Sequence, residues 1–283
     1  MTAATLPIAH DVLLCALRDL PPLPSVVLEL ITSLGRDELG ASEFASKISR
    51  DQALAAKTLR LANSSFYGRG RQVRSVAEAI TVLGLRTVRC VVTAAGMAGS
   101  FPRQAAFDHD SFWRHSVGSA LCAQALAGEL GRDDVDLAFT VGLLHDIGRL
   151  ALASAFAPAY AAVARWQRAK DCPGDVAERA VLGIDHAAVG GLMARQWNFA
   201  PVIVDAIHHH HAPPVAAEIT LTGIAHVADA IAHGLGLSGD ADEAVPALLP
   251  EVWAACGLDD AACMRVFAAT EAQFETVCEA LLD

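Results

Sequence analysis

The sequence predicts an all-α protein built from two helical lobes, and three observations support this prediction. Apolar residues recur three and four positions apart along most of the 283 residues, which is the spacing of one helix face. Prolines, glycines and capping residues divide this pattern into short segments. The chain contains no convincing strand pattern, internal repeat or low-complexity tract. We therefore expect helices almost throughout.

The N-terminal lobe, residues 1–100, is predicted to be a series of short helices. Pro21-Pro22 stops the first helix and Pro24 starts the next, which ends before Gly35. Ser75 with Glu78 three positions later has the capping-box pattern of a helix start, and Gly84 separates that helix from its successor. The predicted helices cover residues 11–20, the segment from 24, and residues 42–49, 51–63, 75–83 and 86–97.

The second lobe, residues 111–283, is predicted to follow a linker at residues 99–110. Asp185 is suited to cap one of its helices and Pro201 to start another. After residue 234, three glycines and two prolines precede one or two closing helices. The predicted helices of this lobe cover residues 111–130, 134–148, 150–169, 174–182, 185–197, 201–210 and 216–234.

The composition excludes several classes of partner. The chain has 21 basic and 32 acidic residues, and a net charge of -11 opposes binding to nucleic acid or to an anionic membrane. No apolar run approaches the roughly 18 residues of a membrane span, and residues 1–10 lack the pattern of a secretory signal. Seven scattered cysteines without a Cys-x-x-Cys pair are typical of reduced thiols. We expect a cytoplasmic protein that binds neither nucleic acid nor membrane.

One local cluster of basic residues departs from this acidic balance. It surrounds the turn Gly68-Arg69-Gly70 and consists of Arg69, Arg71, Arg74, Arg86 and Arg89. Solvated arginines at helix borders are the simpler explanation, and a phosphate or nucleic-acid site is the alternative. We keep the cluster as a candidate contact surface.

The pair His145-Asp146, at the end of an apolar run, is the strongest indication of chemistry. A neutral imidazole beside a carboxylate suits a divalent first-row cation. Neighbouring helical residues point about 100° apart, so further ligands must come from other segments. Four other segments offer them: His115, His186, the pair His210 and His211, and Asp229.

Each of these histidines has a simpler explanation when it is taken alone. A single histidine in a helix is most often a hydrogen-bonded core or surface residue, and the run His208 to His211 would suit a helix C-terminus. We assign His10, His109, His226 and His233 to this structural class. The order of the remaining residues, His, His-Asp, His, His-His and Asp, is what favours a shared site.

This order resembles that of the HD superfamily of metal-dependent phosphohydrolases, and in particular its HDOD branch. Several blocks similar to HDOD sequences follow one another over about residues 16–235, and the final stretch carries no family mark. The blocks are Leu20-Pro21-Pro22-Leu23-Pro24, residues 48–57, 59–68 and 75–86, Phe112-Trp113-Arg114-His115-Ser116, the His145-Asp146 motif and Ala206-Ile207 before the histidine run. The resemblance implies an HD-like helical bundle in the second lobe.

The resemblance also implies a site for one or two divalent ions, such as iron, manganese or another first-row ion. The implied ligands are His115, His145, Asp146, His186, His210, His211 and Asp229. Asp146 would bridge two ions. Arg149 stands where many active relatives have a lysine and would hold a phosphate by paired hydrogen bonds.

Two departures from a related branch, the HD-GYP cyclic-dinucleotide phosphodiesterases, argue against catalysis. Those enzymes have a glutamate one helical turn before the first histidine, where this chain has Ser111. Their Gly-Tyr-Pro signature is missing, because His211 is followed by Ala212-Pro213-Pro214-Val215. The HDOD branch itself is generally regarded as a signalling module without established catalysis.

Two functions therefore remain. The favoured one is a cytoplasmic regulatory protein that binds protein signalling partners and whose metal, if any, is structural or vestigial. The alternative is a metal-dependent phosphohydrolase acting on a nucleotide or another phosphoester, with Asp146 and Arg149 as the catalytic candidates. The two departures favour the first function and the retained histidines favour the second, so the balance lies against an enzyme.

Overall fold

The computed structural model describes residues 7–32, 40–64, 72–105, 107–240 and 244–282, and within these ranges it contains helices and no strand. The first helices are α1 (His10–Arg18), α2 (Ser25–Thr32), α3 (Ala41–Ser49), α4 (Gln52–Ala62), α5 (Val76–Leu83) and α6 (Leu85–Ser100). The following helices are α7 (His109–Glu129), α8 (Val135–Leu144), α9 (Ile147–Ala155), α10 (Ala157–Lys170), α11 (Gly174–Leu182), α12 (His186–Gln196), α13 (Pro201–His209), α14 (Leu221–Gly234), α15 (Pro250–Cys256) and α16 (Asp260–Leu282). The all-α prediction is confirmed.

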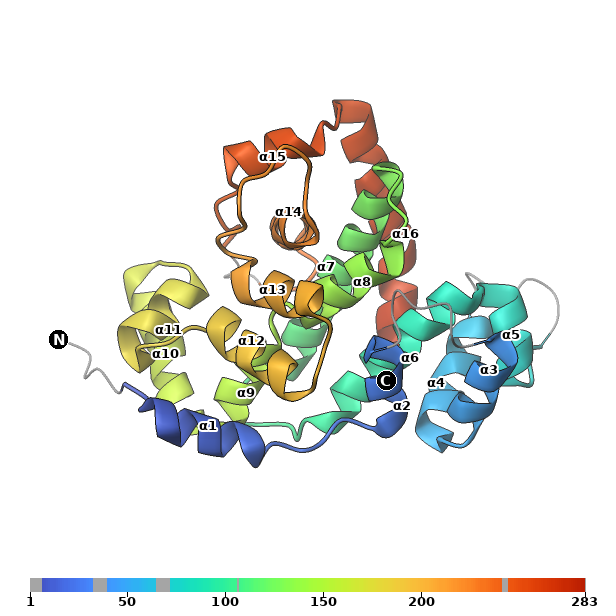
Figure 1. Ribbon diagram of the computed structural model, residues 1–283, viewed down its shortest axis with the longest axis horizontal. Coiled ribbons are helices and arrows are strands. Elements are labelled where there is room, and N and C mark those ends of the chain that lie inside the picture. Colours follow the sequence, from blue (N-terminus) through green and yellow to red (C-terminus); the bar gives the residue numbers. More distant parts are fainter. Residues whose placement is uncertain (1–6, 33–39, 65–71, 106, 241–243, 283) are drawn as a thin grey trace.

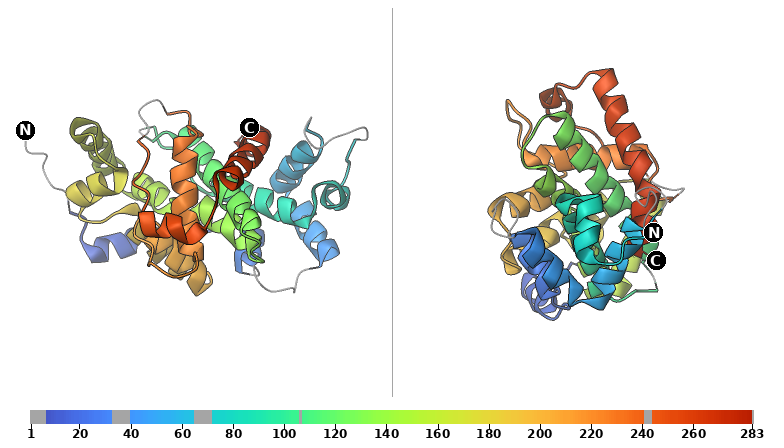
Figure 2. Two further views of the ribbon diagram at one scale, coloured as in Figure 1. Left: turned by 90° about the horizontal axis from the view of Figure 1, so that it is seen from above. Right: turned by 90° about the vertical axis from the view of Figure 1, so that its right-hand side faces the viewer.

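The helices form an elongated molecule. Helices α3, α4 and α5 lie at one end, α10 and α11 lie at the other, and α7, α8 and α14 occupy the middle (Figure 1). The view from above shows the same long axis (Figure 2). Helix α7 packs most extensively against α8, α14 and α16, so the middle of the molecule is a helical bundle.

Helices α2 to α6 form a small apolar core. Ile31, Phe44 and Leu61 are completely buried there. Helix α2 lies very close to α6, because a Cβ atom built on Gly96 would come within 2.1 Å of a methyl carbon of Val27. A larger residue than glycine would therefore push the two helices apart.

The predicted capping residues stand at the ends of the observed helices. The Ser75 hydroxyl accepts a hydrogen bond from the Glu78 N–H at 3.2 Å, but the Glu78 carboxylate accepts from the N–H of Arg74. Gly84 separates α5 from α6 with a φ of +83°, a conformation that glycine adopts without strain. Asp185 caps α12 by accepting from the Ala188 N–H at 2.8 Å. The predicted helix end before Gly35 lies outside the described residues.

Three predicted helices have clearly different bounds. The segment predicted as 150–169 is divided at Phe156, where α9 ends at Ala155 and α10 begins at Ala157. The segment 134–148 is divided, because α8 ends at Leu144 and α9 begins at Ile147. Asp146 causes this break with φ and ψ of -95° and 7°, which lie outside the helical region. The segment predicted as 216–234 becomes helical only at Leu221, where the Thr220 hydroxyl caps the helix.

Two glycines let helices approach each other around this break. A Cβ atom on Gly142 of α8 would lie 2.6 Å from the Ser119 carbonyl oxygen of α7. A Cβ atom on Gly148 of α9 would lie 2.0 Å from the His186 carbonyl oxygen of α12. Because both contacts involve backbone atoms, only glycine fits at either position. The segment 145–146 is thereby held between α7 and α12.

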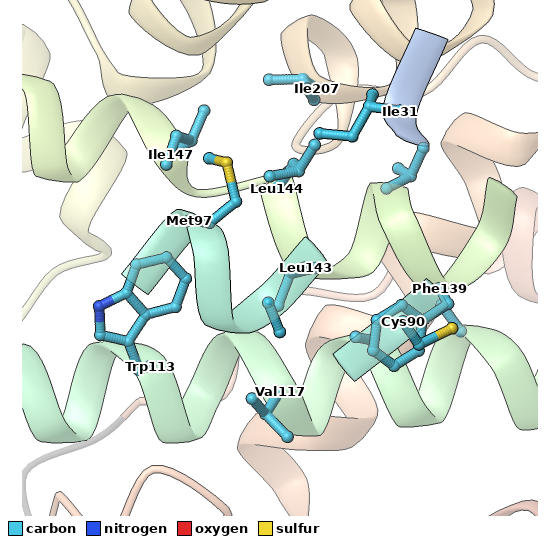
Figure 3. Close-up of a cluster of buried hydrophobic side chains, with 14 of the residues drawn as sticks. Ile31, Cys90, Met97, Trp113, Val117, Phe139, Leu143, Leu144, Ile147 and Ile207 are labelled. Carbon is cyan, nitrogen blue, oxygen red and sulfur yellow. The ribbon is translucent and has the colours of Figure 1, made fainter. Parts of the chain in front are cut away.

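The apolar core is continuous along the molecule. Ile31, Cys90 and Met97 of the N-terminal helices share one buried cluster with residues of the later helices (Figure 3). Helix α16 packs against α4, α6 and α7, and the Lys57 ammonium donates to the Leu281 carbonyl. The division into lobes at residues 1–100 and 111–283 stays a prediction.

Within the described residues, Val135–Ala155 is long and apolar enough to pass for a membrane span, and α5 with α6, bent by 118°, would pass only if the two helices were counted as one span. The most apolar window of Val135–Ala155 is 83% buried inside the protein, as in the core of a helical bundle. The same segment contains the break at His145 and Asp146.

Candidate metal centre

Seven side chains that the sequence singles out come together in the middle of the molecule. They come from five places in the chain: His115 within α7, His145 and Asp146 at the break between α8 and α9, His186 at the start of α12, His210 and His211 just after α13, and Asp229 within α14. Each position except that of His211 is buried. The predicted convergence is therefore present, and the binding of a metal by these residues stays a prediction.

One half of the cluster is arranged around Asp229. Its Oδ1 atom lies 3.1 Å from Nε2 of His115 and 3.5 Å from Nε2 of His145. The two histidine Nε2 atoms lie 3.4 Å apart. Three donor atoms from three helical segments thus face one small volume.

The other half is arranged around Asp146. Its Oδ1 atom lies 3.0 Å from Nε2 of His186, 3.7 Å from Nε2 of His210 and 3.6 Å from Nε2 of His145. Nε2 of His211 lies 2.8 Å from Nε2 of His186. Asp146 therefore lies between the two halves, as the bridging role requires.

Outer hydrogen bonds orient three of the imidazoles. Nδ1 of His145 lies 2.7 Å from the Gly142 carbonyl oxygen, and Nδ1 of His210 lies 2.8 Å from the Ile207 carbonyl oxygen. A carbonyl only accepts, so Nδ1 must carry the proton and the Nε2 lone pair faces the cluster. Nδ1 of His186 donates in the same way to the Glu178 carboxylate at 2.6 Å. Histidine ligands of protein metals commonly have such outer partners.

Burial and mutual charge shift the pKa values of the group. Burial favours a neutral His186, but the carboxylates of Glu178 and Asp146 outweigh it and raise its pKa well above the usual value. Burial likewise opposes ionisation of Asp146, yet His145, His186 and Arg149 hold its pKa well below normal. Burial, followed by the charges of His211 and His145, keeps the pKa of His210 well below its usual range.

The residues fit a divalent cation. The Nε2 atom of His210 is buried and makes no hydrogen bond within the described part of the chain, which is costly unless another group binds it. Nε2 of His186 and Nε2 of His211 face each other at 2.8 Å. Two imidazole nitrogens at that distance share at most one proton, whereas a cation could accept both lone pairs. Nitrogen and carboxylate donors together suit first-row divalent ions.

Arg149 and Tyr160 extend the cluster toward the surface. Arg149 donates to Asp146 Oδ2 at 3.0 Å and to the Tyr160 hydroxyl at 3.4 Å, and that hydroxyl donates to Glu178 at 3.0 Å. Glu178 also accepts a hydrogen bond from His186, and His186 contacts Asp146. The contacts from Arg149 through Asp146, His186, Glu178 and Tyr160 therefore form a closed ring. The Arg149 side chain is 32% exposed.

The histidines assigned to structural roles divide into two kinds. His226 joins backbone segments, because its Nδ1 donates to the His210 carbonyl and its Nε2 accepts from the Leu249 N–H. Nε2 of His109 accepts from the Gln104 N–H at 2.7 Å. His233, in contrast, places Nε2 3.2 Å from Asp229 Oδ1, at the edge of the cluster.

The sequence alone does not predict that Glu178 and His233 lie at the cluster. Glu178 lies eight residues before His186 in a different helix, and no motif marks it. His233 carried one available signal, since it follows Asp229 by four positions and so lies on the same helix face.

The candidate basic surface is only partly described. Arg69 and Arg71 lie outside the described residues. The Arg86 guanidinium lies 3.5 Å from Asp136, and that of Arg89 lies 5.8 Å from the ring centre of Phe44. These contacts are typical of arginines at helix borders, and the contact surface stays a prediction.

Comparison with known proteins identifies relatives of this chain. The HDOD domain family matches residues 20–213. An uncharacterized protein of Treponema pallidum (strain Nichols) is 27% identical over 202 residues, which are 71% of this chain and 39% of that protein. The chain therefore spans well under half the length of the curated relative that it matches.

Solved structures with the same fold cover almost the whole chain. A candidate phosphohydrolase of Shewanella amazonensis SB2B has a TM-score of 0.74 at 28% identity, with 95% of this chain and 98% of that chain covered. An HDOD domain protein of unknown function from Geobacter sulfurreducens has a TM-score of 0.77 at 22% identity, with coverages of 96% and 98%. A candidate metal-dependent phosphohydrolase of Shewanella amazonensis SB2B has a TM-score of 0.63 at 20% identity, with the same two coverages. The last two similarities support the fold alone.

Proposed function

The chain belongs to the HDOD family of the HD superfamily, and on that premise we propose that it binds divalent cations in its central cluster and hydrolyses a phosphoester there. The observation that carries the proposal is the orientation of His145, His186 and His210. Each donates its Nδ1 proton outward and directs Nε2 toward Asp146. Metal-binding histidines almost always have such an outer partner, which fixes the ring and leaves Nε2 for the ion.

The donor set supports one or two first-row ions such as iron or manganese. Imidazole nitrogens and carboxylate oxygens surround Asp146 on one side and Asp229 on the other, and the cluster contains no thiolate. Groups of three potential ligands lie within 4.8 Å of one another on both sides. Asp146 would be shared, since its carboxylate is in reach of both halves.

The charge of a loaded centre favours an anionic substrate. Asp146 and Asp229 would neutralise only half of the charge of two divalent cations, so an anion would be attracted. Arg149 adds a positive charge at the accessible edge, and its Nη2 group makes no hydrogen bond to the described residues. Phosphate oxygens accept well from a guanidinium in this geometry. A phosphoester, including a nucleotide, is the substrate class that fits.

The residues of the chain would divide the work. Cations bound there would polarise a phosphoryl oxygen and make water more acidic. Arg149 would hold a non-bridging phosphate oxygen, and the ring of hydrogen bonds through Tyr160 and Glu178 would keep Arg149 and His186 in place. Hydrolysis would add water across the P–O ester bond, releasing the alcohol and a phosphate.

A regulatory role without turnover is the second candidate. It is favoured by the depth of the cluster, because the side chains of His145 and His210 are almost completely buried. Ser111 and residues 212–215 also depart from the phosphodiesterase pattern. In this case the ion would be structural, and the helical surfaces would bind protein signalling partners. The seven cysteines are all free thiols, which supports a cytoplasmic location for either function.

Metal analysis and hydrolysis assays test the proposal. The full chain is purified without a nickel column, so that the run His208 to His211 cannot take up nickel, and is assayed against bis(p-nitrophenyl) phosphate and a nucleotide panel. We expect near-stoichiometric iron or manganese and a turnover that Asp146→Asn abolishes. Metal-loaded protein without turnover would favour the regulatory role, and metal-free protein would contradict the metal centre itself.

A further inference from the structure

We propose that His233 is an additional cation ligand, which gives the Asp229 side of the centre a donor set of its own: His115, Asp229 and His233. This inference rests on the proposed metal centre. It goes further because it assigns a ligand to a residue outside the His, His-Asp, His, His-His and Asp order. It also predicts that loss of His233 weakens cation binding on the Asp229 side of the centre more than on the Asp146 side.

The geometry places His233 in the cluster. Nε2 of His233 lies 3.2 Å from Asp229 Oδ1, and Nε2 of His115 lies 3.1 Å from the same oxygen. The ligand atoms of these three residues all lie within 4.8 Å of one another. The rings of His115 and His233 pack with their centres 4.2 Å apart, so both imidazoles approach the carboxylate from one side.

The packing of α7 and α14 explains why His233 lies beside His115. Helix α14 packs against α7, and Gly118 of α7 lies against Leu237, just after the end of α14. The C-terminal end of α14, which carries His233, therefore lies near the N-terminal half of α7, which carries His115. The spacing of four residues puts Asp229 and His233 on the same face of α14.

Two further features suit a cation at this position. His233 lies in the last turn of α14, where the exposed carbonyl ends of the helix favour positive charge. Its side chain is 17% exposed, whereas those of His115 and Asp229 are 2% and 5% exposed. His233 is therefore the most solvent-accessible member of this donor set.

A positioning role is the competing explanation. In that case His233 would only donate a hydrogen bond that orients Asp229. Glutamine distinguishes the roles, because its amide can donate a hydrogen bond but is a weak ligand for a first-row ion. His233→Gln would restore a positioning role and would not restore a ligand.

The experiment is calorimetric titration of the full metal-free chain with Mn²⁺, together with the visible spectrum of the Co²⁺-loaded protein. We expect two binding events in the wild type. His233→Gln and His233→Ala should both weaken one event at least about ten-fold and change the Co²⁺ spectrum, because a nitrogen ligand is lost. His10→Gln, at an exposed position at the start of α1, is the control and should leave the spectrum unchanged.

The outcomes separate the two proposals. Two unchanged binding events in His233→Gln, with an unchanged Co²⁺ spectrum, would overturn the role of His233 and leave the metal centre standing. Loss of one event in His233→Ala that is restored in His233→Gln would overturn it in favour of positioning. A wild type that binds no Mn²⁺ or Co²⁺ would overturn the metal centre and this inference together. Thermal melts of the metal-free variants show whether each one is folded.

Discussion

Helices α2 to α6 and the bundle around α7 are built from the same kind of element but bury different groups. In the described part of residues 25–100, the buried polar side chains are Thr58 and Thr93, and the Thr58 hydroxyl bonds to its own helix. The bundle buries aspartate, glutamate and several histidines in one place. Burying such groups costs free energy that apolar residues of similar size would not. The difference supports the proposal that the bundle binds a ligand, whereas α2 to α6 provide an apolar core.

The largest expected effect concerns the carboxylate that lies between the two halves of the cluster. Asp146→Asn keeps the shape of the side chain and removes its charge, so we expect cation affinity to fall by more than about 100-fold, beyond the usual effect of outer partners. Metal content after dialysis measures this loss. Asp136→Asn on α8 is the control and should retain the metal. Equal metal content in Asp146→Asn and the wild type would show that the bundle does not need this carboxylate to bind a cation.

The second prediction concerns the apolar region. Leu61→Ala deletes a completely buried side chain of α4, so the free energy of unfolding should fall by about 2–5 kcal/mol. Urea denaturation measures the change, and Leu59→Ala, at a partly buried position of the same helix, should cost less. The folded Leu61→Ala variant should bind Mn²⁺ with wild-type affinity. A large loss of affinity would show that the cluster depends on the distant core.

A smaller effect is expected from the outer partner of His186. Glu178→Gln removes the charge that orients this imidazole through Nδ1, and such changes typically cost roughly 10–100-fold in metal affinity. Titration with Mn²⁺ measures it. Glu129→Gln is the matched control, because it makes the same change in a carboxylate that pairs with Arg265 at the C-terminal end of α7. Similar affinities of the two variants would deny Glu178 a positioning role.

The smallest effect concerns pH. Although burial opposes protonation, Glu178 and Asp146 raise the pKa of His186, so a bound cation must displace a proton at neutral pH. Affinity should therefore fall as pH is lowered, by up to about ten-fold per pH unit for one proton. In Glu178→Gln the pKa of His186 should fall, so cation affinity should change less with pH near pH 7. Parallel curves for the two proteins would contradict this explanation.

The sequence contained enough to predict the helices and most of the candidate ligands. Pro24, Ser75, Gly84 and Asp185 act through their own backbone and nearest neighbours, so their positions at helix ends follow from local physics. The His145-Asp146 pair could be recognised because an adjacent imidazole and carboxylate at the end of an apolar run is an uncommon combination. The resemblance to HDOD sequences then indicated the other segments.

The helix break at Asp146 and the outer partners could not be predicted in this way. Apolar residues continue on both sides of the break, because α8 and α9 are both largely buried. The sequence pattern therefore shows no interruption within residues 134–148. Glu178 becomes a partner of His186 only when α11 and α12 fold together, and His233 joins Asp229 at the cluster only when α14 lies against α7. Nothing in the local sequence distinguishes these residues from other polar residues in helices.

By itself, the sequence determined that this protein is helical, where most helices begin and end, and which side chains can act as ligands. Only the tertiary structure decided that Asp146 lies between two groups of imidazoles, that Glu178 orients one of them, and that His233 stands beside Asp229. The physical reason is that propensity and capping act over a few residues. The position of a lone pair, in contrast, depends on packing between helices far apart in the chain, here at Gly142 and Gly148 where backbones touch.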